Sequence, residues 1–202
     1  MGGAGAELTG GNFWQGAVTG LVVSGLNHAM HSSDSDNSGS VREKVAQVAE
    51  SKDGSTAYAI ANEIDNFDVG DNKCNKFVYD VTTEAGASPG TPNGIFGTSP
   101  PSAGQWADPN YKIKNWRVVS NPQRGDVVSY AKNYSDATGH TAIMVSKTHS
   151  MGANASVVHK TNFGYGKSHL GGGESYVYRR YFATPQQRFN YQFYNWINTK
   201  RK

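Results

Sequence analysis

The sequence contains one cysteine, Cys74, among 202 residues. An intramolecular disulfide is therefore excluded, and the thiol serves either packing or chemistry. Concentrated charge of one sign is also missing: the net charge is only +3, and the basic residues are scattered up to the last three. This distribution excludes the positive surface patch of a nucleic-acid-binding domain. What is present, 24 glycines and 11 tyrosines with only 17% charged residues, is typical of a turn-rich, aromatic-rich α+β protein.

Charged residues are absent from residues 8–33. The apolar part of this stretch, residues 13–26, is shorter than the roughly 20 residues that a membrane helix needs, and we do not expect it to span a bilayer. A serine- and aspartate-rich tract, residues 32–40, predicts a flexible linker. No basic segment opens the sequence, so we expect no cleavable signal peptide. The chain therefore divides into a head, residues 1–40, and a body, residues 41–202.

The body is expected to contain helices first and strands afterwards. Helical spacing of apolar residues predicts helices from Val41 to near Gly54, from Thr56 to Ile64, and from Cys74 to Gly86. β-Branched and aromatic runs predict strands over residues 116–119, 126–130, 141–146, 156–159 and 176–182. The loop between these two sets, residues 87–110, is rich in Gly, Pro, Ser and Thr, and loops of this length are usually functional or disordered. Helices followed by an antiparallel sheet indicate the α+β class.

Cys74 stands where the third of these helices is expected to begin, with Asn72 as the N-cap. Unpaired N–H groups and the positive end of the helix dipole favour a thiolate there, and Lys73 and Lys76 add positive charge nearby. Farther along the chain, His140 opens a β-rich run, which supplies the second half of a Cys/His nucleophilic pair. The two side chains should then lie within hydrogen-bond reach of each other. A lone cysteine that only packs in the core is the competing interpretation.

Three segments occur in the order expected of one enzyme family: residues 73–78 (KCNKFV), 122–128 (PQRGDVV) and 139–145 (GHTAIMV). Together they resemble the NlpC-type and CHAP-type cell-wall hydrolases, the bacterial branch of the papain-like cysteine peptidases. The resemblance covers roughly residues 41–182 and implies a papain-like fold in which N-terminal helices pack on a central antiparallel sheet. Lys73 departs from the family pattern, which usually has Asp at this position, and this departure bears on the substrate more than on the reaction.

The resemblance also implies the roles of individual residues. Cys74 would attack an amide carbonyl, His140 would hold the thiol as an ion pair and protonate the leaving amine, and N–H groups at the helix start would receive the oxyanion. A third polar residue should orient the His140 ring. Asn162 fits the Cys-His-Asn arrangement of papain-like and CHAP enzymes, whereas His159 fits NlpC-like members. We place Asn162 first, and a purely structural hydrogen bond is the alternative for each.

Two aromatic residues are further candidates for contact with the substrate. Tyr58 precedes Cys74 by about the distance at which NlpC-like enzymes place a tyrosine beside the oxyanion. Trp106 lies in the long loop and could line a groove for peptide or glycan, because indole rings stack on sugars. Core packing is the competing interpretation of both. The histidines have no cysteine or carboxylate at ligand spacing, so we expect no metal site and no cofactor.

The head has a resemblance of its own. Residues 10–28 (GGNFWQGAVTGLVVSGLNH) resemble the segment that joins the core of Rhs-type polymorphic toxins to their variable C-terminal toxin. This implies a secreted effector that acts in the periplasm or cell wall of a target bacterium, with a cognate immunity protein in the producer. We expect a monomeric cysteine amidase or endopeptidase acting on peptidoglycan stem peptides. The alternatives are a toxin of the same fold that cleaves or modifies a protein, a non-catalytic wall-binding module, and a pore former using residues 13–26.

Overall fold

The computed structural model describes residues 39–94, 97–135, 137–165 and 175–184, together with Phe189, Phe193 and Trp196. The chain forms two compact units: a main unit, residues 40–184, and a second unit that combines residues 1–39 with residues 185–202. The head and its predicted linker lie outside the described residues. Within the described ranges, no helix is long and apolar enough to cross a membrane.

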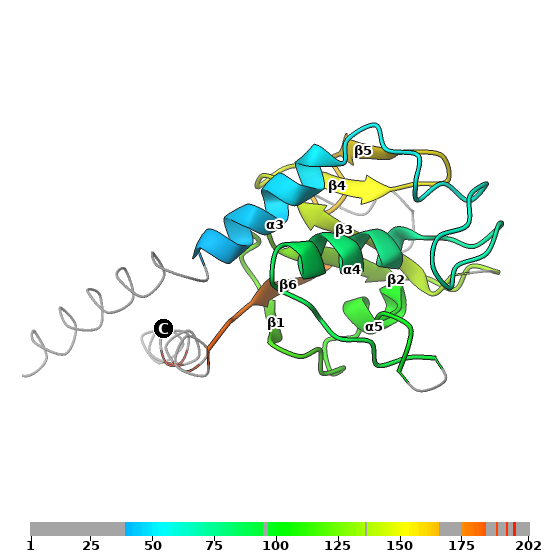
Figure 1. The fold of residues 1–202 in the computed structure, drawn as a ribbon. Helices are drawn as coiled ribbons and strands as arrows, with labels where there is room; N and C mark the ends of the chain where they lie inside the picture. Colours follow the sequence, from blue (N-terminus) through cyan, green and yellow to red (C-terminus); the bar gives the residue numbers. More distant parts are fainter. Residues whose placement is uncertain are drawn as a thin grey trace, which may run out of the picture. The chain divides into compact units, whose positions relative to one another are not determined.

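Six strands of the main unit form one antiparallel sheet with the order β1-β6-β2-β3-β4-β5 (Figure 1). The strands are β1 Trp116–Val119, β2 Val127–Ala131, β3 Gly139–Met144, β4 Ser150–Ala153, β5 Val158–Thr161 and β6 Val177–Tyr181. The last strand, β6, lies between β1 and β2 and pairs with both. This arrangement confirms the predicted α+β class with an antiparallel sheet.

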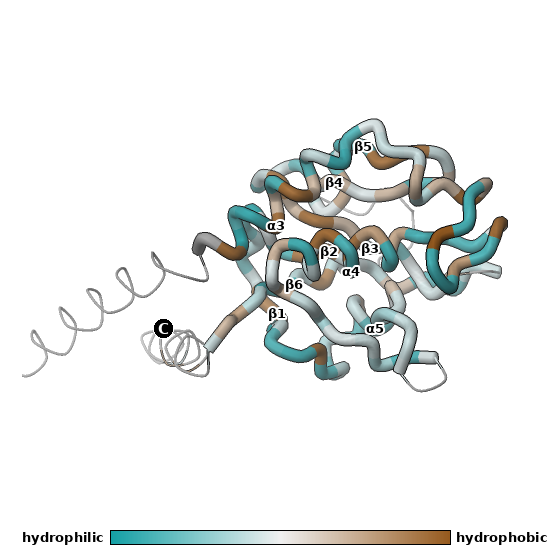
Figure 2. Tube along the Cα trace, in the orientation of Figure 1, coloured by the Kyte–Doolittle hydropathy of each residue, from teal (hydrophilic) through white to brown (hydrophobic). Residues whose placement is uncertain are grey.

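In the described ranges, the helices that accompany the sheet are α3 Gly39–Ser51, α4 Cys74–Glu84 and α5 Ala103–Ala107. The apolar face of α4, with Phe77, Val78 and Val81, belongs to the same buried cluster as Val127 and Ile143 of the sheet. The tube of α3 alternates between polar and apolar colours in Figure 2, as expected for a helix with one buried face. Residues on the other face of the sheet form a second, smaller cluster.

The helix predictions are confirmed at two places and wrong at two. Both α3 and α4 form, and Gly86 follows the end of α4 with a φ of 86°, the backbone conformation that glycine adopts most easily. The predicted helix at residues 56–64 is absent. Ile60 N–H donates instead to the carbonyl oxygen of Ala155, in the connection between β4 and β5. The predicted N-cap is also wrong: Lys73 occupies that position, without a side-chain hydrogen bond.

The sequence patterns did not predict two short elements, α5 and β4. Residues 87–110 contain α5, whose start is stabilised by a capping box between Ser102 and Gln105. The strand β4 is only four residues long and includes Gly152, so it lacks the β-branched run that predicts a strand.

The segment 122–128 anchors α3 to the sheet. Arg124 forms ion pairs with Glu43 at 3.0 Å and Glu50 at 2.7 Å, both on α3. Gly125 has a φ of 84°, and a Cβ atom there would lie 2.2 Å from the carbonyl oxygen of Arg42. This contact explains why the segment needs glycine where the helix approaches it.

Candidate active site

A pocket of about 220 Å³ lies beside Cys74. Its lining comes from the turn before α4, the first turn of α4, the start of α5 and the connection between β2 and β3. The lining residues are Phe67, Asp71, Asn72, Cys74, Asn75, Ser102, Ala103, Ala137, Thr138 and Gly139. The volume is below the roughly 300–1,000 Å³ of drug-sized ligand sites, and it suits a short segment of a peptide.

Cys74 is the first residue of α4 and is buried, with 6% of its surface exposed. The backbone N–H groups of Asn75 and, from β3, Thr141 favour the thiolate of Cys74. Burial acts against them and has the larger effect, so it raises the pKa of the Cys74 thiol. The expectation of a lowered thiol pKa is wrong, because burial of the sulfur outweighs the N–H groups around it.

The two lysines beside Cys74 make contacts of their own. Lys73 is buried, and its Nζ donates to the carbonyl oxygens of Asp68 at 2.8 Å and Asp71 at 2.9 Å. Lys76 forms ion pairs with two carboxylates, one of which is Asp65 at 2.6 Å. The two ammonium groups therefore bind the backbone and the carboxylates around the start of α4. They do not stabilise the Cys74 thiolate as predicted.

His140 is the second residue of β3 and depends on the glycine before it. Gly139 has a φ of 143°, and a Cβ atom there would lie 2.1 Å from the carbonyl oxygen of Tyr130 on β2. The His140 ring packs edge-to-face on Phe163, with the ring centroids 4.8 Å apart. Its Nε2 lies 3.5 Å from the position that a Cβ of Gly152 would occupy, which is an ordinary van der Waals distance and places Gly152 beside the ring. Burial, together with the charge of His159, lowers the pKa of His140 to about 4.

The sulfur of Cys74 lies close to β3, but the described part of the chain shows no hydrogen bond between the Cys74 and His140 side chains. The sulfur lies near the N–H of Thr141, the residue after His140. Strand alternation turns the His140 ring toward the sheet face that carries Ala142, whereas α4 covers the face that carries Ile143. The predicted hydrogen bond between thiol and ring is therefore not formed, because the ring turns to the face of the sheet opposite to α4.

The structure links His159, one of the two candidate third residues, to His140. His159 lies on β5 directly opposite Gly152, the residue beneath the His140 ring, and its charge contributes to the lowered pKa of His140. Asn162 follows β5, and its carbonyl oxygen accepts a hydrogen bond from Tyr165 N–H. Its role in the site stays a prediction.

The two aromatic candidates lie in the core. Trp106 is completely buried and packs edge-to-face on Trp116 at 5.2 Å, which corrects the expectation that it lines a groove. Tyr58 is 6% exposed, packs on Phe77 and donates its hydroxyl hydrogen to Asp80 at 3.0 Å. Neither residue lines the pocket beside Cys74, because the apolar interior encloses both rings.

Several pocket residues carried no motif in the sequence. Thr138 and Asn72 adjoin the recognised segments, and this closeness to His140 and Cys74 is a signal that could have identified them. Asp71 is also close to Cys74 in the sequence, whereas Ser102 stands at the start of α5, which only the folded chain brings to the thiol. In the described ranges, no three His, Cys, Asp or Glu side chains gather closely enough to hold a metal ion.

Comparison with known proteins finds a family model that matches part of the main unit. Residues 64–161 match the family model of the CHAP domain. No curated protein matches the chain. Among solved structures, a chain of the type VI native effector-immunity complex Tae3-Tai3 from Ralstonia pickettii is similar, with 17% sequence identity and a TM-score of 0.41. The similarity covers 70% of this chain and 98% of that chain.

Proposed function

We propose that the protein is a cysteine amidase or endopeptidase that cleaves amide bonds of peptidoglycan stem peptides; the match of residues 64–161 to the family model of the CHAP domain supports this. The position of Cys74 carries the proposal. Its thiol begins a helix, adjoins an open pocket, and lies near the N–H groups of Asn75 and Thr141, with His140 adjacent in β3. A cysteine that only packed in the core would have no need of a pocket beside it.

The charge states of the resting site determine how the reaction starts. The pKa of Cys74 is raised and the pKa of His140 is lowered to about 4, so near neutral pH both groups are uncharged. The resting ion pair expected from the sequence is thereby replaced by a thiol and a neutral imidazole. His140 consequently takes the proton of the thiol as the sulfur attacks, in the manner of a general base.

The bonds change in two stages. The Cys74 sulfur adds to the amide carbonyl carbon, and backbone N–H groups at the start of α4 stabilise the oxyanion. The carbon–nitrogen bond then breaks, and His140 gives its proton to the departing amine. Water hydrolyses the remaining thioester, which releases a carboxylate and restores the thiol. The His140 ring has to reach the sulfur in the substrate complex for this sequence to run.

We assign the orienting role to His159 and keep Asn162 as the second candidate. The support for His159 is its place opposite Gly152, on the Nε2 side of the His140 ring. His159→Gln should lower kcat by about 10- to 100-fold, because an unoriented base loses part of its general-base contribution. Asn162→Ala is the matched comparison. A larger loss in Asn162→Ala than in His159→Gln would transfer the role to Asn162.

Digestion of purified sacculi tests the reaction. The wild-type protein should release soluble fragments whose masses, read by mass spectrometry, identify the amide bond that is cut. Cys74→Ala should release none. Intact sacculi after incubation with the wild-type protein, combined with cleavage of a protein substrate, would favour the protein-directed alternative.

The toxin role rests on the resemblance of residues 10–28 to the Rhs-type junction segment. An effector of this kind acts on a target cell, and its producer needs a cognate immunity protein that blocks the site around Cys74. Expression of residues 41–202 with a periplasmic signal should therefore halt bacterial growth, whereas cytoplasmic expression should be tolerated, because the wall lies outside the inner membrane. Toxicity confined to the cytoplasm would contradict a wall substrate.

A further inference from the structure

Three aromatic side chains in the second unit lie in a row along a helix. Phe189, Phe193 and Trp196 are in helical conformation, and their spacing of four and then three residues places them on one helix face. The rings of Phe189 and Phe193 are stacked with centroids 6.0 Å apart and an interplanar angle of 8°. The rings of Phe193 and Trp196 are also 6.0 Å apart, at 20°. We call these three residues the aromatic row.

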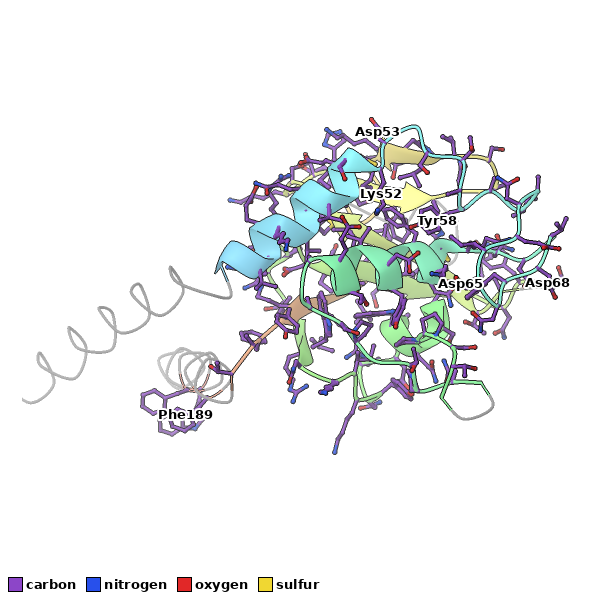
Figure 3. All side chains as sticks on the ribbon, viewed as in Figure 1. Lys52, Asp53, Tyr58, Asp65, Asp68 and Phe189 are labelled. Atoms are coloured by element: carbon purple, nitrogen blue, oxygen red, sulfur yellow. The ribbon has the colours of Figure 1, made fainter. Side chains whose placement is uncertain are left out.

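The two ends of the aromatic row are exposed. Phe189 keeps 58% of its surface exposed and Trp196 keeps 56%, and the Phe189 side chain projects from its helix (Figure 3). By contrast, Trp106 and Trp116 are buried in the core of the main unit. Large rings are normally buried as these two are, and a group of exposed rings marks a surface that binds another molecule.

The amino-acid sequence around the row favours an anionic partner. Residues 185–202 contain four basic residues, Arg188, Lys200, Arg201 and Lys202, and neither aspartate nor glutamate. Asparagine and glutamine stand between the aromatic residues, so the segment has no apolar run of the roughly 20 residues that a membrane-spanning helix needs. A helix with Phe and Trp on one face, polar residues between them and basic residues beside it is typical of a segment that lies in the membrane interface.

We propose that the aromatic row and the basic residues beside it form a surface that binds bilayers of anionic phospholipids. The rings enter the boundary between headgroups and acyl chains, where aromatic side chains are favoured, and the lysine and arginine side chains attract the lipid phosphates. The two contributions add, because binding strength scales with buried apolar area and with attraction to anionic lipids. Cys74 lies in the main unit, so membrane binding is independent of the proposed cleavage.

Co-sedimentation of the full chain with lipid vesicles tests the proposal. Vesicles of phosphatidylcholine alone are neutral, and vesicles that also contain phosphatidylglycerol are anionic. We expect binding to the anionic vesicles to be at least about tenfold tighter at low salt, and the preference to shrink as the salt concentration rises. Cys74→Ala should bind as tightly as the wild-type protein, so the outcome does not depend on activity. Equal binding to both kinds of vesicle, or binding to neither, would overturn the proposal.

Substitutions in the aromatic row test the apolar contribution. The double variant Phe189→Gln, Trp196→Gln should bind anionic vesicles about tenfold more weakly, because less apolar area enters the interface. The control is Val118→Gln, Tyr165→Gln, which removes two exposed apolar side chains of the main unit and should keep the affinity. If the first variant binds as tightly as the control, the aromatic row is not the contact and the proposal is wrong.

A second set of variants tests the charge. Replacement of all three basic residues at 200–202 by Gln should lower the affinity for anionic vesicles by about 30- to 100-fold at low salt, since each charge near the surface contributes roughly fivefold. The control Lys112→Gln, Lys114→Gln, Lys147→Gln has the same net charge and changes three exposed lysines of the main unit, so its loss should be much smaller. Equal losses in the two triple variants would show attraction by net charge alone and would contradict a localised surface.

The fluorescence of Trp196 distinguishes a bilayer from other anionic partners. In a Trp14→Phe background the remaining tryptophans besides Trp196 are Trp106 and Trp116, which are buried and should not respond. We expect the emission to move to shorter wavelength with anionic vesicles and to stay unchanged with inositol hexakisphosphate, which offers phosphates without an apolar phase. A shift with the soluble polyanion, or no shift with vesicles, would refute insertion into a membrane and favour a soluble anionic partner.

Discussion

Replacing His140 by Gln should make the protein more resistant to acid, although it removes the proposed general base. Burial and the charge of His159 lower the pKa of His140 from 6.5 to about 4. Between these values the unfolded chain binds a proton that the folded protein does not. The stability that the neutral ring provides is therefore complete above pH 6.5 and is lost as the pH falls toward 4. Gln takes up no proton in this range.

The size of the effect follows from the two pKa values. One pKa unit corresponds to about 1.36 kcal/mol. Relative to pH 7.5, protonation of the unfolded chain at this single position lowers the free energy of unfolding by about 2 kcal/mol at pH 5 and by about 3 kcal/mol at pH 4. Domains are stable by only about 5–15 kcal/mol in total, so one residue accounts for a measurable part of acid sensitivity.

Urea unfolding of the wild-type protein and His140→Gln at pH 7.5 and pH 5 measures this difference. Loss of the ring contact with Phe163 lowers the stability of the variant equally at both pH values, and carboxylates titrate alike in both proteins. The gap between the two free energies should therefore shift by about 2 kcal/mol in favour of the variant at pH 5. His149→Gln, at an exposed position, is the control. A difference in unfolding free energy that stays the same at both pH values would refute the claim that burial lowers the pKa of His140.

Further predictions concern the nucleophile, the reaction and the fold. Cys74→Ala should abolish cleavage and lower the free energy of unfolding by about 1 kcal/mol, because the thiol is buried; unchanged activity would make Cys74 a packing residue. The kcat/KM of the wild-type protein should be level from pH 5 to 8 and fall as the pH drops through about 4, since the base must be neutral; an acidic limb near pH 6.5 would contradict this. Gly139→Ala should inactivate the enzyme and lower its melting temperature far more than Gly54→Ala. Both glycines have a positive φ, but of the two only Gly139 has backbone atoms where the new Cβ would lie. Residues 41–202, expressed alone, should fold and keep activity in the sacculus assay, and loss of either would assign the head a structural role.

Sequence patterns predicted the secondary structure correctly where residues close together in the sequence determine it. The spacing of Val45, Val48 and Ala49 predicts α3, and the glycine at position 86 predicts the end of α4, because helical periodicity and a positive φ are properties of short segments. The same reasoning failed for residues 56–64. Their backbone forms hydrogen bonds with the segment around Ala155, and such distant pairing overrides local helical propensity.

The same distinction between local and distant causes applies to the candidate site. The sequence by itself determined that a cysteine begins a helix and that a histidine opens a strand, since the periodicity of apolar residues acts within a few residues. Only the tertiary structure decided that burial raises the pKa of Cys74, that His159 neighbours His140, and that Ser102 joins the pocket. Burial and charge depend on every group packed around an atom, and here those groups come from α4, the turn before it, and β3 to β5, which are distant along the chain and meet only when the sheet has formed.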